Sequence, residues 1–199
     1  MNDTALMLVD IQNDYFPGGK MALENMDLAA ENAAFLLRLF RKRGLPVFHI
    51  QHVSAHPRAP FFQAGTMGVE IYASVTPDPG EPVIIKHFPN SFRETSLLNQ
   101  LHAATVKTLV VCGAMSHMCI DATVRAAVDA GFNCLVAYDA CATRELSFLS
   151  HTVVASEVHA AFMAALSGLY AQVLPSSTIM DKITRRPESK TSRNEASFG

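Results

Sequence analysis

The residue best suited to chemistry in this sequence is Cys119. It follows the apolar run 108–112 and a turn of small residues, and a helical pattern continues from Ile120. A thiol on the first turn of a helix lies near unpaired backbone N–H groups and the positive end of the helix dipole, which favour the thiolate. Because an isolated cysteine is more often a small core residue, a nucleophilic role needs support from other residues.

Asp10 and Lys86 give that support. Asp10 follows the apolar run 5–9, and Lys86 follows the run 82–85. Short Val/Ile/Leu runs predict buried parallel strands, whose carboxyl ends meet at the edge of the sheet where functional crevices form. A carboxylate can accept the thiol proton, and an ammonium group favours both anions. The three side chains therefore predict a nucleophilic site.

Around these residues the sequence resembles the isochorismatase-like cysteine hydrolases, which include nicotinamidases, N-carbamoyl amide hydrolases and isochorismatases. The matching segments follow the order of the family and are Leu8–Phe16, Val83–Lys86 with Ser91 and Phe92 behind it, and Val110–Ile120. The resemblance implies a catalytic triad. In it Asp10 is the base, Lys86 the electrostatic partner, and Cys119 the nucleophile that forms a thioester-type acyl-enzyme.

The resemblance also implies a cis peptide bond between Ala114 and Met115. In the family this turn aims the N–H groups of Met115 and Cys119 at the developing oxyanion, and so forms an oxyanion hole. Further expected substrate-binding residues are Gln12 and Phe16 after the base, Ser91 and Phe92 after the lysine, and His117 beside the nucleophile.

Three histidines, His49, His52 and His56, cluster near the end of the second apolar run. Nicotinamidases hold a divalent metal in this region with an Asp-x-His motif and two further histidines, but the present cluster lacks a neighbouring carboxylate. Three histidines could bind zinc; alternatively His49 packs against the sheet while the other two form hydrogen bonds within the loop. We predict no metal and no other cofactor.

The composition predicts a globular domain without nucleic-acid partners. The chain has 199 residues, of which 49% are hydrophobic and 17% charged, with a formal net charge of -2. This is enough apolar material for a large core, and no Lys/Arg-rich run suits a phosphate backbone. We find no apolar run long enough to span a bilayer and no secretory signal pattern, so we expect a cytoplasmic protein with no membrane partner.

The four cysteines predict neither a disulfide framework nor a structural zinc site, because no Cys-x-x-Cys pair is present. Cys112 and Cys134 lie within apolar strand patterns and are expected in the core. Cys141 is expected just past a strand and near the crevice, but no base is close to it in the sequence.

Alternating strand and helix patterns predict a single-domain α/β fold. We expect a three-layer sandwich of the Rossmann type, with a mostly parallel sheet of about six strands and helices on both faces. The expected strands are 5–9, 46–50, 82–86, 108–112, 133–137 and 170–174, and the expected helices are one capped by Asp27 and stopped by Gly44, then 97–104, 119–130 and 152–169.

Three segments have roles of their own in this interpretation. The long, Pro- and Gly-containing loop 52–81 is expected to face the substrate. Helix 152–169 has little polar surface, which suggests that a second subunit covers it in a homo-oligomer, a dimer or tetramer. The domain is expected to span 1–180, and the polar segment 181–199 to be a disordered tail.

Together these features predict a hydrolase that cleaves a small amide or related C–N bond through Cys119. One alternative is vinyl ether hydrolysis, as in isochorismatases, a reaction that does not need a thiolate. Another is a catalytically idle binding or scaffold domain of the same fold, and a third is a redox-sensing thiol, for which no resolving cysteine is evident.

Overall fold

The fold is built on a six-stranded sheet whose neighbouring strands are all parallel. The computed structural model describes residues 3–56 and 58–184. The strand order is β3-β2-β1-β4-β5-β8. The strands are β1 (Thr4–Val9), β2 (Val47–His52), β3 (Val83–Lys86), β4 (Thr108–Ala114), β5 (Asn133–Ala142) and β8 (Gln172–Leu174). The predicted α/β class with its parallel sheet is therefore confirmed.

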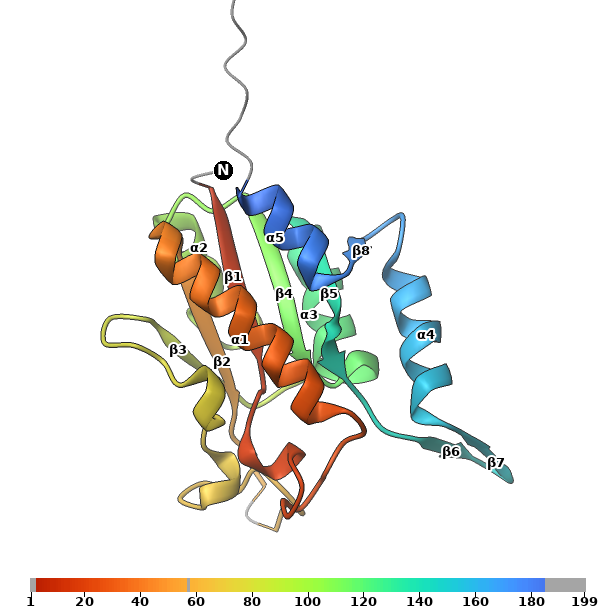
Figure 1. Cartoon of the computed structure of the whole chain (residues 1–199). Helices are drawn as coiled ribbons and strands as arrows, with labels where there is room; N and C mark the ends of the chain where they lie inside the picture. The colour runs from red at the N-terminus through yellow and green to blue at the C-terminus, as the bar shows by residue number, and fades with distance from the viewer. Residues whose placement is uncertain (1–2, 57, 185–199) are drawn as a thin grey trace, which may run out of the picture.

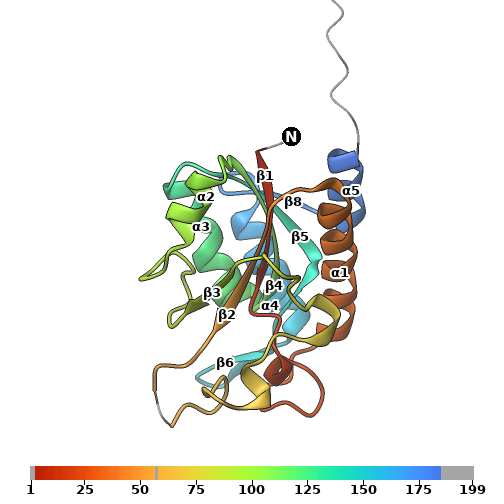
Figure 2. The ribbon, with the colours of Figure 1, turned by 90° about the vertical axis from the view of Figure 1, so that its left-hand side faces the viewer.

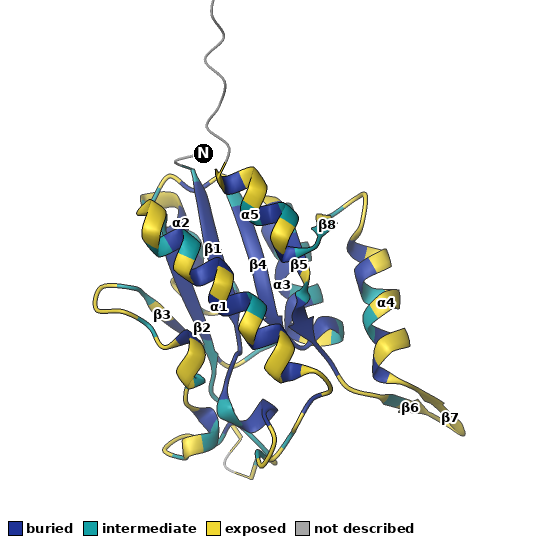
Figure 3. Ribbon diagram, in the orientation of Figure 1, coloured by how far each residue is buried: buried dark blue, intermediate teal, exposed yellow. Residues whose placement is uncertain are grey.

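Helices cover both faces of the sheet, which makes three layers (Figure 1, Figure 2). The helices are α1 (Met26–Arg43), α2 (Leu97–Ala103), α3 (Asp121–Asp129), α4 (Ala155–Leu166) and α5 (Ser176–Thr184). Helices α1 and α5 lie on one face and α2 and α3 on the other, and each side buries its own apolar cluster. The central strands are buried along their length, as Figure 3 shows, because they are covered on both faces.

Helix α1 shows how local sequence sets the ends of an element. It begins two residues earlier than expected, because Asn25 in a left-handed conformation is the N-cap and Asp27 lies within the first turn. The Asp27 carboxylate still interacts favourably with the positive end of the helix dipole. Gly44 ends the helix as predicted, with φ 61° and its N–H bonded to the carbonyl groups of Phe40 and Arg41.

The order of the strands places a crevice at β1. The chain crosses from β1 to β2 and β3 on one side and to β4 and β5 on the other, so β1 and β4 flank a topological switch point. Val9 lies opposite Gly113 of β4, and His52 lies opposite Lys86. Residues just after these positions therefore meet at one edge of the sheet.

The segment 152–169 is not one helix, contrary to the sequence prediction. Leu146–Phe148 (β6) and His151–Val153 (β7) pair in an antiparallel hairpin, and α4 covers only the following residues. The β-branched run Thr152–Val154 favours the extended conformation over a helix. The hairpin projects away from the sheet in Figure 1, and its residues Phe148 and Leu149 are 75% and 87% exposed.

The expected boundary of the tail at residue 181 is too early. Residues 181–184 continue α5, and the side chain of Ile183 is buried in the cluster beside α1. The rest of that segment, 185–199, lies outside the described residues. Within the described part of the chain, no helix combines the length and the apolar character needed to cross a membrane.

Candidate active site

Cys119 lies in a single turn of π-helix between β4 and α3. After β4 the chain passes through a cis peptide bond between Ala114 and Met115 and then forms the π-helical segment Ser116–Ile120. The regular helix α3 begins only at Asp121, so Cys119 does not occupy the first turn of an ordinary α-helix. Single π-helical turns are frequent at functional sites. The side chain of Cys119 is 3% exposed and lines a cavity.

Asp10 and Lys86 form a buried ion pair next to this turn. Lys86 Nζ lies 2.8 Å from Asp10 Oδ2, and both side chains have no exposed surface. The ammonium group also contacts His52 Nδ1 at 3.1 Å and donates to the carbonyl group of Phe88 at 3.2 Å. Neither oxygen of Asp10 accepts a hydrogen bond of normal geometry from the described residues. The carboxylate therefore keeps lone pairs for a proton from another group.

The structure brings the three predicted triad residues together. One ligand atom each of Asp10, His52 and Cys119 lies within 4.8 Å of the other two, and Lys86 Nζ lies 2.8 Å from Asp10 Oδ2 and 3.1 Å from His52 Nδ1. Asp10 has a φ of 54°, a left-handed conformation that aspartate tolerates better than most residues. Asp10 follows the end of β1, His52 ends β2 and Lys86 ends β3. The turn after β4 holds Cys119.

The electrostatics of the site favour the thiol form of Cys119. Burial raises the pKa of Cys119, the Asp10 carboxylate raises it further, and Lys86 opposes them only in part. Burial and Asp10 therefore oppose the thiolate that a helix terminus was expected to favour. Burial lowers the pKa of Lys86, but Asp10 and Cys119 raise it by more, so the lysine stays charged. A reaction at this sulfur would therefore need a base to take the thiol proton.

A mainly apolar cavity of about 160 Å³ lies in front of the sulfur. Its walls are Tyr15, His52, Ser54, Ala59, Pro60, Phe61, Phe62, Pro89, Met115, Met118 and Cys119. The segment 52–81 supplies several of these residues. The N–H of Phe62 donates to Asp14 Oδ2 at 2.7 Å, which fixes the loop against the segment after β1.

The structure places the two predicted binding residues after Asp10 away from the cavity wall. Gln12 is fully buried, and its side chain donates to the carbonyl groups of His52 and Val69 while its oxygen accepts the N–H of His52. Phe16 is 3% exposed and stacks on Tyr72. Gln12 therefore ties the loop to the sheet, and Phe16 packs within the core. Tyr15, between them, lines the cavity instead.

The other three predicted binding residues also point elsewhere. Ser91 is buried and bonds to Thr123 Oγ1 at 2.8 Å, and Phe92 packs near Phe132. His117 Nδ1 bonds to Thr143 Oγ1 at 2.6 Å and does not line the cavity. Ser91 and His117 thus hydrogen-bond to other elements of the fold, and Phe92 packs against the apolar cluster. The position of His117 two residues before Cys119 in the sequence does not determine the direction of its side chain.

Comparison with known proteins decides the family. The model of the isochorismatase domain matches residues 4–176. The chain belongs to the isochorismatase family. It is 58% identical over 170 residues to the uncharacterized isochorismatase family protein YddQ of Bacillus subtilis, covering 85% of this chain and 94% of that protein. It is 32% identical over 146 residues to the maleamate amidohydrolase of Pseudomonas putida, covering 66% and 68%.

Solved structures agree with this result. A crystal structure of an isochorismatase-type chain from Oleispira antarctica matches with a TM-score of 0.88 and 50% identity, covering 90% of this chain and 97% of that one. Members of the isochorismatase family are hydrolases, and they include amidases. The resemblance seen in the sequence is therefore confirmed.

A resident metal, as the isochorismatase-family nicotinamidases have, does not fit these residues. His49 is buried and bonds to Glu81, and His56 is exposed, so neither joins His52. The group that gathers metal-binding atoms in the described chain is Asp10, His52 and Cys119. Lys86 already places its ammonium group against Asp10 and His52, and a metal cation between the same atoms would meet this positive charge.

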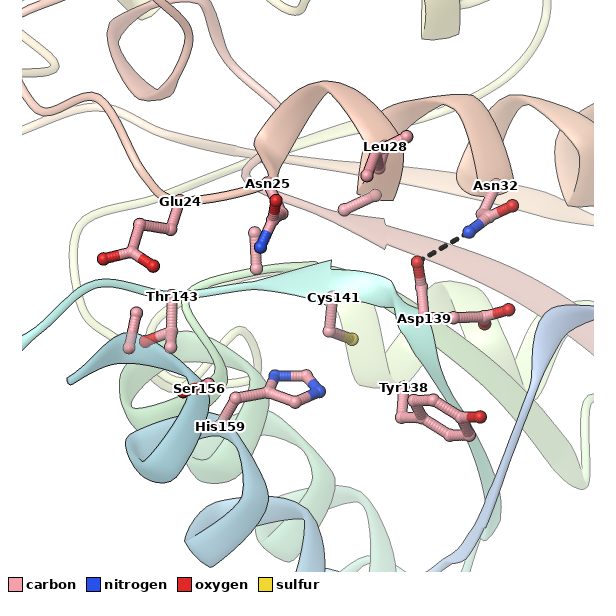
Figure 4. Close-up of a pocket in the computed structure, with 13 residues that line it drawn as sticks. Glu24, Asn25, Leu28, Asn32, Tyr138, Asp139, Cys141, Thr143, Ser156 and His159 are labelled. Atoms are coloured by element: carbon pink, nitrogen blue, oxygen red, sulfur yellow. Dashed lines mark hydrogen bonds between the residues drawn. The ribbon is translucent and has the colours of Figure 1, made fainter.

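A second cavity of about 440 Å³ lies between α1, β5 and α4 (Figure 4). Cys141 and His159 both lie at this cavity, and Asn32 donates to the carbonyl group of Asp139 beside it. Cys141 lies within β5 rather than past it, and burial raises the pKa of its thiol to about 12. His159 bonds to Ser116 Oγ at 2.8 Å. This cavity thus adjoins the far side of the π-helical turn and holds no activated thiol. Cys112 and Cys134 are core residues, as predicted.

Proposed function

We propose that this protein is a cysteine hydrolase that cleaves a small amide or a related C–N bond. The observation that carries the proposal is the position of the Cys119 thiol, which lines a mainly apolar cavity next to the buried ion pair of Asp10 and Lys86. The family includes hydrolases of C–N bonds, among them the maleamate amidohydrolase and nicotinamidase relatives.

In the proposed first half-reaction, Asp10 takes the proton of the Cys119 thiol as the sulfur attacks the carbonyl carbon of the amide. The C=O double bond opens to an oxyanion, which the N–H groups of Met115 and Cys119 are proposed to stabilise. When the C–N bond breaks, the amine leaves with the proton held by Asp10. The product on the enzyme is a thioester.

In the second half-reaction, water replaces the amine. Asp10 removes a proton from the water as its oxygen attacks the thioester carbonyl, and the C–S bond then breaks. The proton returns to the sulfur, and the carboxylic acid is released. Lys86 lies 2.8 Å from Asp10 Oδ2 and offsets the cost of burying this carboxylate next to the sulfur.

Substitution of Cys119 tests the proposal. An amide panel assayed by ammonia release, with and without chelator, should include nicotinamide, N-carbamoyl amino acids, ureido compounds and simple amides. We expect Cys119→Ala to abolish turnover while the circular dichroism spectrum stays native. Cys134→Ala is the matched control, because it removes another buried thiol and should leave turnover intact. Retained activity in the Cys119 variant would refute the mechanism, and loss of activity with chelator would point to a metal.

The alternatives predict different results in the same assays. An idle domain would turn over no amide and form no acyl-enzyme detectable by mass spectrometry. A vinyl ether hydrolase would keep activity toward vinyl ethers in the Cys119→Ala variant, because that reaction proceeds by protonation of carbon. We retain amide hydrolysis because the sulfur lines the cavity next to a carboxylate that has lone pairs free.

We further propose that the protein is a cytoplasmic homo-oligomer, a dimer or tetramer, in which a second copy covers α4. The outward face of α4 carries the exposed residues Ala160, Ala161, Ala164 and Ala165. Such small side chains permit the close approach of another helix. Light scattering coupled to gel filtration should give a mass of two or four chains, and Ala164→Arg should reduce it, whereas Ala164→Ser should not. A monomeric wild-type protein would contradict this proposal.

A further inference from the structure

The cavity in front of Cys119 has no charged wall. The described residues that line it include no Asp, Glu, Lys or Arg. The ion pair of Asp10 and Lys86 next to the sulfur is fully buried, and its two charges balance. Arg144 affects the pKa of Tyr15, but its side chain is exposed and does not line the cavity. A ligand in this cavity therefore meets no cation among the described residues that line it.

The polar groups of the cavity are also neutral near pH 7. Burial raises the pKa of the Tyr15 phenol well above its usual value, and burial lowers the pKa of His52 to about 4. The Cys119 thiol has a raised pKa, and the hydroxyl group of Ser54 is the remaining polar group among the side chains. These groups can donate or accept single hydrogen bonds, but they cannot neutralise a charge.

The size and shape of the cavity limit the ligand further. Its volume is about 160 Å³, and the rings of Tyr15, Phe61 and Phe62 form one side, with the centroids of Tyr15 and Phe62 4.6 Å apart. An apolar protein cavity of about 150 Å³ holds one benzene molecule. The space in front of the sulfur therefore accommodates a group of about six non-hydrogen atoms.

We propose that this cavity binds the acyl part of the substrate and selects neutral, mainly apolar acyl groups, while rejecting acyl groups that carry a carboxylate. The inference rests on the proposed amide hydrolysis at Cys119. A carboxylate entering the cavity would lose its hydration without gaining a cation, and that penalty is large. A neutral acyl group of the same shape pays no such penalty and packs against the rings.

Three amides of nearly equal shape test this selection. They are 4-methylpentanamide, succinamide and succinamate, which end in an isopropyl group, a neutral amide and a carboxylate. We expect kcat/KM for 4-methylpentanamide to exceed that for succinamate by at least about 100-fold, with succinamide between them. Equal or faster turnover of succinamate would overturn the inference, while leaving the proposed cysteine hydrolysis in place.

Ala59 offers a way to reverse the selection. This residue lines the cavity, and its backbone is held by hydrogen bonds to His56 and Gln63. Ala59→Lys adds a cation at the wall, and Ala59→Met adds similar bulk without charge. We expect the preference for 4-methylpentanamide over succinamate to fall at least about tenfold in Ala59→Lys relative to Ala59→Met. An unchanged preference would count against the cavity as the acyl site.

Alkylation of Cys119 gives a measurement that does not depend on turnover. Iodoacetamide and iodoacetate differ in the charge of one small group, and their labelling rates at Cys119 can be followed by peptide mass spectrometry. The free thiol 2-mercaptoethanol gives the reference ratio of the rates with iodoacetamide and iodoacetate. We expect this ratio to be higher for Cys119 by a factor of about ten or more. A protein that turns over no amide would refute the proposed function, and this ratio would still test the charge selection. Equal labelling by iodoacetate would overturn it.

Discussion

Lys86 Nζ lies 2.8 Å from Asp10 Oδ2, and neither side chain has any surface exposed to solvent. A buried charge is costly unless it is paired, so each side chain offsets the desolvation of the other. The same pair is placed beside Cys119 by the register of the central strands. The stability of the fold and the chemistry of the site are thus linked through these two residues.

Removal of both partners should therefore cost less stability than the sum of the two single removals. We expect Lys86→Met to lower the free energy of unfolding by about 3–5 kcal/mol, because Asp10 is left as an unpaired buried charge. The double variant Asp10→Asn/Lys86→Met should be less destabilised than the sum of the single variants by about 2 kcal/mol or more. Urea unfolding at pH 7 measures all three variants. Additive single effects would show that the two charges are not coupled.

The sequence predicts the triad because its residues stand at the ends of recognisable strands. Asp10 and Lys86 each follow or end an apolar run, and parallel strands bring such positions to one edge of the sheet without further information. The same argument fails for Gln12, Ser91 and His117. Their side chains turn away from the cavity through hydrogen bonds to residues distant in sequence, and no local pattern encodes those partners.

The cavity walls could not be predicted for a related reason. Phe62 forms part of the wall because its N–H bonds to Asp14, 48 positions away in the chain. Nor does sequence alone give the ionisation state of Cys119, because burial, which opposes the helix dipole, depends on the packed structure. The extended hairpin before α4 was missed because its apolar residues continue the pattern of the following helix.

Gly113 should not tolerate a side chain. Its φ is 124°, and a Cβ atom there would lie 1.9 Å from the carbonyl oxygen of Val9 on the neighbouring strand. We expect Gly113→Ala to lower the free energy of unfolding by more than about 4 kcal/mol or to prevent soluble expression. Gly131→Ala is the control, since its φ is also positive but the space around it is open. Its expected cost is about 1–2 kcal/mol, and equal effects in thermal unfolding would contradict the argument from close strand contact.

Asp14 should act on substrate binding by positioning Phe62. Its Oδ2 accepts the N–H of Phe62 and its Oδ1 accepts the N–H of Lys20, so Asp14→Asn turns one acceptor into a donor that faces another donor. We expect KM for the preferred amide to rise about 5–20-fold, with a smaller change in kcat, because the wall of the cavity loosens.

Asp139→Asn is the matched control for Asp14→Asn. Asp139 likewise accepts two hydrogen bonds, from the N–H and the hydroxyl group of Ser176 at the start of α5, and it does not line the cavity of Cys119. We expect this variant to lose stability while KM stays within about twofold of wild type. A similar rise of KM in both variants would show that general destabilisation, and not the position of Phe62, is responsible.

Glu81 should make the stability of the fold depend on pH in the acidic range. It accepts two hydrogen bonds from the guanidinium group of Arg41 and one from His49. Burial alone would raise the pKa of Glu81, but Arg41, the N–H of Asp78 and His49 lower it overall from 4.5 to about 2. Because the pKa is lower in the folded state than in the unfolded state, Glu81 stabilises the fold above pH 4.5. This contribution disappears as the pH falls from 4.5 to about 2.

The substitution Glu81→Gln should therefore have an effect that depends on pH. We expect it to lower the free energy of unfolding by about 1–2 kcal/mol at pH 7, a modest value because the Arg41 side chain is partly exposed. Near pH 2 the difference in the free energy of unfolding between the variant and the wild type should disappear. Glu94→Gln is the control, because Glu94 is 66% exposed and lies 3.5 Å from Arg93 on the surface. Urea unfolding at pH 7, 4.5 and 2.5 measures the difference, and a cost of Glu81→Gln that is constant across this range would contradict the assignment.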